Sequence, residues 1–140
     1  MTRSTVVSAD LIDEALAAII EHAYIACGVG AEAAVKDMRE QISESVGSGV
    51  KYPRLPNRSS APLEAPVNQF GDLHDSIHVD LSPDIIGIGA AAVVDDETGK
   101  FLEFGTSKMR PRPFAGPGAV VGAEATEAYV KTIPARLENL

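Results

Sequence analysis

Residue types that occur in catalytic and metal sites stand together at one place in the sequence. His74 and His78 lie four residues apart, with Asp75 and Ser76 between them. On a helix this spacing would direct two imidazoles to one metal ion, but the alternating pattern of residues 76–82 predicts a strand with both histidines on its solvated polar face. A serine next to a histidine and an aspartate is also no catalytic triad, because a triad needs side chains that converge in space. We therefore predict no metal or catalytic site here.

Two further candidates for chemistry are equally weak. The run GIGAAAVVDD, residues 87–96, is similar to the glycine turn of a dinucleotide site, but turn residues follow too soon for the helix that would receive a pyrophosphate. Cys27 lies in the apolar run AYIACGV, which predicts a buried small side chain, since a reactive thiol needs basic neighbours. We predict that the protein is not an enzyme and binds no cofactor.

A strip of alternating basic residues indicates a different role. Lys108, Arg110 and Arg112 occupy every second position, interleaved with prolines that hold the backbone extended. Such a strip loses little entropy on docking, and its natural partner is an acidic face of a neighbouring subunit or ring, with Phe114 as the apolar anchor. The alternative is that the segment only connects a strand to a helix and that its cations are solvated.

Length and charge limit the class of protein. The chain has 140 residues, which predicts one domain, and its 12 basic and 20 acidic side chains give a net charge of −8. This charge argues against a dedicated binder of duplex DNA, whose affinity comes mostly from Lys and Arg, although DNA could still pass nearby. Because neither a signal peptide nor an uninterrupted run of 18 apolar residues is found, we expect a soluble intracellular protein without a membrane partner.

The residues before position 73 divide into a helical segment and an arm. Residues 8–47 are predicted to be helical, with Ser8 as the N-cap, although two internal glycines leave open whether this is one kinked helix or two. Residues 48–72 have four prolines among polar residues, which predicts an extended arm or loop. We expect its section from 51 to 66 to be mobile in the free subunit and ordered by a neighbour. Three exposed residues of this arm are candidate interface residues: Tyr52, Arg54 and Arg58.

The remaining residues are predicted to form a small sheet and a second helix. Residues 73–115 should contain the sheet and the Pro-rich strip: strands at 76–82 and 84–94 would form a hairpin, 95–99 an acidic turn, and FLEF, residues 101–104, a third strand. Glu103 in that strand would face solvent or pair with an arginine, and it is a further candidate residue of the subunit or ring interface. Residues 116–140 should hold a C-terminal helix, centred on 119–132, and a tail weakened by Pro134. The expected fold is α+β, with long N-terminal and C-terminal helices packed on a small antiparallel sheet.

Two motifs carry a resemblance to a known family. FGDLHDSI at residues 70–77 and LEFGTSKMRPRPF at residues 102–114 resemble segments of the neck, or tail-completion, proteins of long-tailed bacteriophages. In that family T-G-x-L-x-x-S-I leads into the sheet, and E-[FY]-G-T followed by R-P-F ends it. The similarity covers roughly residues 8–132. The arm YPRLPNRSSAPLEAP also resembles the actinobacterial-phage branch, with Leu63 in place of a glycine. In the first motif, Phe70 stands in place of the threonine before Gly71.

The resemblance implies a structural protein of the virion, made in the host cytoplasm. Such a protein forms a homo-oligomeric ring, expected to be six-fold, between the head-closure protein on the capsid side and the tail terminator on the tail side. Duplex DNA crosses the lumen without sequence-specific binding, and an acidic lumen would repel it. Alternatively, the charge only keeps the monomer soluble. Two other interpretations remain: a tail terminator or head-closure ring protein, and a non-enzymatic cellular protein-binding module.

Overall fold

The computed structural model describes residues 8–81 and 89–138, and its longest element is a single helix. Helix α1, Ala9–Glu44, runs unbroken for 36 residues. Ser8 caps it, as predicted, because the backbone N–H of Leu11 donates to Ser8 Oγ at 3.2 Å. The choice between one helix and two is therefore settled in favour of one.

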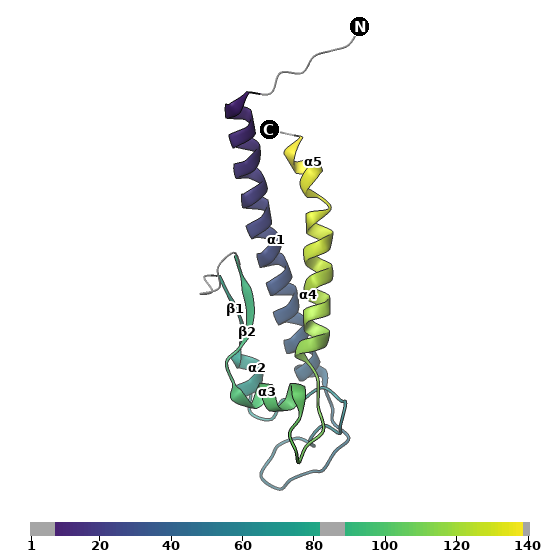
Figure 1. The fold of residues 1–140 in the computed structure, drawn as a ribbon. Coiled ribbons are helices and arrows are strands. Elements are labelled where there is room, and N and C mark those ends of the chain that lie inside the picture. Colours follow the sequence, from purple (N-terminus) through teal and green to yellow (C-terminus); the bar gives the residue numbers. More distant parts are fainter. Residues whose placement is uncertain (1–7, 82–88, 139–140) are drawn as a thin grey trace.

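Helix α1 forms an antiparallel pair with helix α4, Ala115–Val130 (Figure 1). Small residues let the two backbones approach closely: a Cβ atom placed on Gly122 would lie 2.8 Å from the carbonyl oxygen of Gly30. At the upper end of the pair, His22 Nδ1 lies 2.9 Å from the hydroxyl of Tyr129. A Cβ atom on Gly30 would lie 3.0 Å from the carbonyl oxygen of Gly122 and would overlap the hydroxyl of Thr126, so the close helix pair requires a glycine at this position of α1.

The C-terminal helical region differs in detail from the prediction. Helix α4 begins four residues before position 119, and a short helix α5, Ile133–Leu137, follows it. Pro134 lies in the first turn of α5, where a proline is tolerated because the N–H that it lacks would have no partner within the helix. The proline therefore begins a new helix rather than weakening the tail.

A β-hairpin lies against α1, preceded by the short helix α2, Asp72–Ser76 (Figure 1). Strand β1, Ile77–Asp80, pairs antiparallel with strand β2, Ala91–Val94, and Ile77 is opposite Val94. The predicted hairpin is confirmed, although residues 82–88 of the two predicted strands lie outside the described part of the chain. The α+β class, with two long helices and a small antiparallel sheet, is also confirmed.

The predicted third strand is wrong, because residues 101–104 belong to a helix. Helix α3 comprises Glu97–Phe104, and Asp96 caps it by accepting a hydrogen bond from the N–H of Thr98 at 2.9 Å. The expected acidic turn at 95–99 is thus the start of this helix. An Asp followed by Glu supplies both an N-cap and a negative charge in the first turn, a signal that outweighed the apolar character of FLEF.

The hydrophobic core occupies only the lower half of the molecule, where α1, the hairpin and the start of α4 meet. Its buried members are Ala34, Val35, Met38, Ile42, Ile77 and Phe114. Apolar side chains continue at three- and four-residue spacing toward the N-terminus of α1. There Ile12, Leu16 and Ile19 are exposed, and Cys27 is only half-buried. The prediction that Cys27 is buried is therefore only partly right.

By length and composition, α1 is apolar enough to cross a membrane. Its most apolar window of 18 residues has a mean hydropathy of 1.3, and 28% of that window is buried inside the subunit. The core helix of a soluble protein passes the same test. The feature that calls for an explanation is the exposed apolar face of the N-terminal half.

Candidate functional site

Two segments far apart in the sequence meet at the lower end of the molecule. The backbone N–H of Leu63 donates to the carbonyl of Pro111 at 2.9 Å, and Arg112 Nε donates to the carbonyl of Ser60 at 3.0 Å. We call residues 48–71 and 105–113 together the basic end. It holds six of the 12 basic residues and one of the 20 acidic residues, whereas the rest of the chain has six basic and 19 acidic residues.

The arm within the basic end is organised rather than extended. The N–H of Gly49 donates to the carbonyl of Ser59 at 2.8 Å, and the N–H of Ser59 donates to the carbonyl of Val50 at 3.0 Å. Ser45 Oγ donates to the carbonyl of Ala65 at 2.8 Å, which ties the far side of the loop to the end of α1. The arm thus folds back on itself as a loop, and the expected mobility of residues 51–66 in the free subunit stays a prediction.

One carboxylate holds this loop closed. Glu64 accepts hydrogen bonds from the Ser48 hydroxyl, from the N–H of Ala61 at 2.8 Å and from the N–H of Ser48 at 3.1 Å. The Ser48 hydroxyl is the main reason that the pKa of Glu64 lies below its ordinary value of 4.5, with smaller contributions from the two N–H groups and from the charge of Arg112. The only acidic residue of the basic end therefore has a structural role.

A neighbouring residue of the loop has an unusual backbone. Leu63 has a φ of 70°, in the left-handed region that favours glycine, and its side chain is 76% exposed. At this position the actinobacterial-phage branch that the arm resembles has a glycine. A glycine in place of Leu63 would adopt this backbone conformation without a steric penalty.

Glu103 neither faces solvent freely nor pairs with an arginine, so both predictions for it are wrong. From α3 its Oε2 accepts hydrogen bonds from the N–H groups of Phe114 at 2.7 Å and Ala115 at 2.8 Å, and its Oε1 accepts from Gly116 N–H at 2.8 Å. The side chain of Phe114, the N-cap position of α4, makes no capping bond. Glu103 therefore caps α4 across a separation of 11 residues or more and satisfies N–H groups that the first turn leaves free.

The predicted basic strip divides into structural and exposed parts. Phe114 is 1% exposed and lies in the core, so within this fold it is not available as a docking anchor. Arg112 is half-buried, bonded through Nε to the arm, while its backbone N–H donates to the carbonyl of Leu102 at 2.6 Å. Lys108 and Arg110 remain exposed beside a tight turn closed by Thr106 N–H on the carbonyl of Met109 at 2.8 Å.

The candidate residues of the arm lie on the same end. Tyr52, Arg54 and Arg58 are exposed, and Arg58 Nη1 donates to the carbonyl of Gly49 at 3.3 Å. The structure thus brings the arm cations and the strip cations together, although more than 45 residues separate them in the sequence.

A cleft of about 580 Å³ lies at the basic end, where the arm, α2, α3 and the strip meet. Its lining combines apolar residues, among them Tyr52, Leu55 and Met109, with the cationic residues Lys108 and Arg112 and the acidic residues Asp72 and Asp96. Such a cleft can receive an apolar side chain of a partner while the cations hold a nearby carboxylate.

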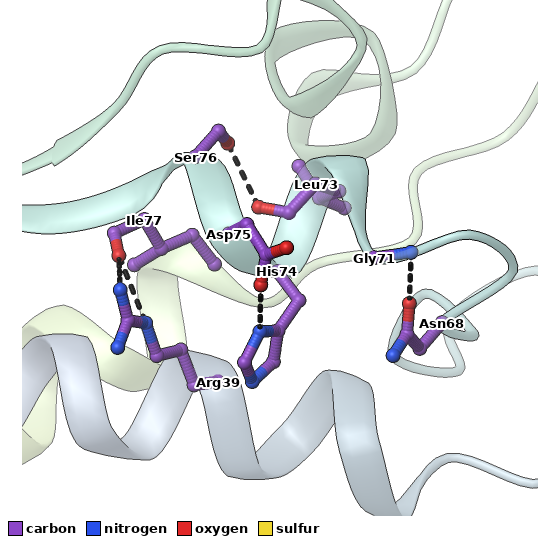
Figure 2. A network of polar contacts seen from close by, with 8 residues as sticks. All are labelled: Arg39, Asn68, Gly71, Leu73, His74, Asp75, Ser76 and Ile77. Carbon is purple, nitrogen blue, oxygen red and sulfur yellow. Dashed lines mark hydrogen bonds and ion pairs between the residues drawn. The ribbon is translucent and has the colours of Figure 1, made fainter.

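The residues first considered for chemistry do not converge on one point (Figure 2). His74 belongs to α2 rather than to a strand, and its Nδ1 lies 2.9 Å from Asp75 Oδ1, while Ser76 Oγ donates to the carbonyl of Leu73 at 2.8 Å. His78 is on β1, as predicted, and lies 3.4 Å from the carboxylate of Asp95. Within residues 8–81 and 89–138, no group of three or more His, Cys, Asp or Glu side chains is placed to hold a metal ion.

The polar contacts of this region serve to position the hairpin. Arg39 of α1 donates from Nε to the carbonyl of Ile77 at 2.9 Å and also contacts this oxygen through Nη2 (Figure 2). Asn68 Oδ1 accepts from the N–H of Gly71 at 2.8 Å, just before α2, where Gly71 has a φ of 88°. The FGDLHDSI segment is therefore a structural connection that joins the arm to β1.

Comparison of the chain with family models, with curated proteins and with solved structures finds no match.

Proposed function

We propose that this protein is a non-enzymatic structural subunit of the neck of a long-tailed bacteriophage. In that role it forms a homo-oligomeric ring between the head-closure protein and the tail terminator, and DNA leaves the head through the lumen. The subunit is made in the host cytoplasm and acts in the virion.

The segregation of charge carries this proposal. A subunit with a basic end and an acidic remainder can dock on an acidic face of a neighbouring subunit or ring, and the charges select the correct partner and orientation. The 19 acidic residues outside the basic end also suit a protein past which DNA must slide without adhering.

The motif residues behind the resemblance have a consistent physical role in this arrangement. Glu103 caps α4, Gly105 has a φ of 75° next to the strip, and Phe114 fills the core. Together they fix the chain on either side of Lys108 and Arg110, so the two exposed cations are presented on a rigid support. This supports an assembly surface more than a flexible connection.

The cleft favours a second candidate, a non-enzymatic binding module that receives a peptide at the basic end. Its apolar residues fit one large apolar side chain of a short peptide, while Lys108 and Arg112 together with Asp72 and Asp96 can pair with peptide charges of both signs. A tail terminator or head-closure ring protein of the same virion region would share the location and partners of the first proposal but would make different contacts.

Electron microscopy and mass measurement test the proposal. The purified protein should form rings on its own or bind to the end of phage tails. When it is mixed with tails and with filled heads that lack it, heads and tails should join. The variant Lys108→Glu/Arg110→Glu should stay folded, because exposed substitutions usually change the free energy of unfolding by less than about 0.5 kcal/mol, but it should fail to join the particles. Arg112 is left unchanged because it holds the arm.

The matched control is Lys36→Glu/Lys131→Glu, which makes the same change in net charge at exposed lysines away from the basic end. This control should join heads and tails normally. Joined particles with the Lys108 and Arg110 variant would refute the proposed docking surface. A wild-type protein that stays monomeric and binds neither heads nor tails would favour the binding module.

A further inference from the structure

The N-terminal part of α1 exposes an apolar surface that the other residues among 8–81 and 89–138 leave uncovered. We call residues 9–25 the helix tip. Its large exposed apolar side chains are Leu11, Ile12, Leu16, Ile19, Ile20, Tyr24 and Ile25, which are 40% to 57% exposed. Lower on the same helix, Met38 and Ile42 are buried by the hairpin and by the start of α4. The apolar stripe is therefore longer than the core that covers it.

The helix tip is also strongly acidic. It has four carboxylates, those of Asp10, Asp13, Glu14 and Glu21, and the sequence has no Lys or Arg from position 4 to position 35. Helices that lie on membranes combine an apolar face with Lys and Arg, because most membrane surfaces are negative. The charge of the tip therefore disfavours a lipid surface and favours a cationic protein surface.

The basic end of the same chain has the complementary properties. It presents Lys108, Arg110 and Arg54 together with exposed apolar side chains, among which Leu63 is 76% and Phe70 is 68% exposed. One subunit cannot join its own two surfaces, because they lie at opposite ends of a helix about 54 Å long (Figure 1).

We propose that the basic end of one copy docks on the helix tip of the next copy. The contact is head-to-tail in the sense that the basic end of one copy meets the helix tip of the next. Two helix tips facing each other would bring four carboxylates against four more, and two basic ends would repel in the same way. The docked pair as a whole still offers one free basic end and one free helix tip. A head-to-tail contact of this type closes into a ring when its rotation allows, and otherwise forms a filament. The inference rests on the self-assembly that the proposed function requires.

Charge exchange between two variants tests the contact. The first variant is Lys108→Glu/Arg110→Glu at the basic end, and the second is Asp13→Lys/Glu14→Lys at the helix tip. Alone, each should associate at least about tenfold more weakly than the wild type in analytical ultracentrifugation, because like charges then face each other. Mixed in equal amounts, they should assemble again, since each altered surface meets an oppositely charged one on the other variant. Raising the salt concentration should dissociate the wild-type assembly.

Each other outcome overturns the inference. If the mixture of the two variants does not assemble, or if neither variant alone associates more weakly than the wild type, the head-to-tail contact is excluded. A wild type that remains monomeric at high concentration would do the same. Stronger association of the helix-tip variant alone would indicate tip-to-tip pairing, and flotation of the wild type with vesicles of phosphatidylcholine and phosphatidylglycerol would indicate a lipid partner.

The test separates the two proposals. If the charge exchange behaves as expected but the protein does not join heads to tails, the contact stands and the phage role fails. If heads and tails join while the charge exchange has no effect, the phage role stands and this contact fails.

Discussion

Removing the carboxylate of Glu103 should destabilise the subunit through α4, although Glu103 lies in a different helix. Three backbone N–H groups, those of Phe114, Ala115 and Gly116, donate to this side chain at 2.7 to 2.8 Å. The variant Glu103→Ala removes their acceptor and leaves the first turn of α4 without a cap, because the residue at the N-cap position makes no side-chain capping bond.

The size of the effect follows from the exposure of these three donors. Gly116 is exposed, so water can replace the carboxylate there at little cost, whereas Phe114 is buried and Ala115 is half-buried. Loss of a helix cap costs about 0.5 to 2 kcal/mol, and a buried donor without an acceptor costs about 1 to 3 kcal/mol. We expect the free energy of unfolding to fall by about 2 to 3 kcal/mol, which lowers Tm by roughly 6 to 12 °C in a chain of this length.

Urea unfolding followed by circular dichroism at pH 7 measures this change. Glu103→Gln should lose at most about half as much stability, because its amide oxygen can still accept from Phe114 and Ala115, whereas its NH2 group cannot accept from Gly116. The control is Glu124→Gln, which makes the same substitution at an exposed position of α4 and should change stability by less than about 0.5 kcal/mol. If Glu103→Ala unfolds at the same urea concentration as the wild type, Glu103 does not cap α4 and the argument is refuted.

Two further predictions concern the helix pair and the loop. Gly122→Ala should lower the free energy of unfolding, and with it Tm, because its Cβ would lie 2.8 Å from a carbonyl oxygen of α1. The expected loss is about 1 to 3 kcal/mol from overpacking, less the gain in helix propensity. Gly28→Ala, which meets nothing within 4 Å, should instead raise stability by about 0.5 to 1 kcal/mol, and the opposite order of the two melting temperatures would contradict the packing. Because the folded pKa of Glu64 lies below its unfolded value near 4.5, its stabilising contribution is complete above that value and is lost as the pH falls through the folded pKa. The difference in urea midpoint between the wild type and Glu64→Gln should therefore shrink from pH 7 to pH 3, and a constant difference would argue against this role.

The sequence predicted the elements whose signals are local. The cap at Ser8, the three- and four-residue spacing along α1 and the alternation at residues 76–82 each depend on neighbouring residues, and the structure confirms the long helix and the hairpin. The FLEF segment is predicted wrongly because its three apolar or aromatic residues suit a strand as well as a helix, and the deciding signal is the cap at Asp96.

The candidate site could be predicted only in part because it depends on contacts between distant segments. Lys108 and Arg110 were identified from their spacing, and they are exposed. The roles of Phe114 and Glu103 were missed, since each is set by a partner that only the fold brings near. A carboxylate within an apolar run, together with a later helix that lacks a capping residue, was the available signal for Glu103.

The one-sided position of the core has a consequence for local unfolding. The buried side chains cluster around Met38, Ile42 and Phe114, whereas residues 9–21 of α1 are covered by few neighbours. Amide hydrogens should therefore exchange with solvent progressively faster along α1 from Ile42 toward Ala9, because the upper turns can open without disrupting the core. The part of the subunit around Met38, Ile42 and Phe114 is thus the most stable, whereas residues 9–21 of α1 are held in place mainly by a surface that packs against them from outside the subunit.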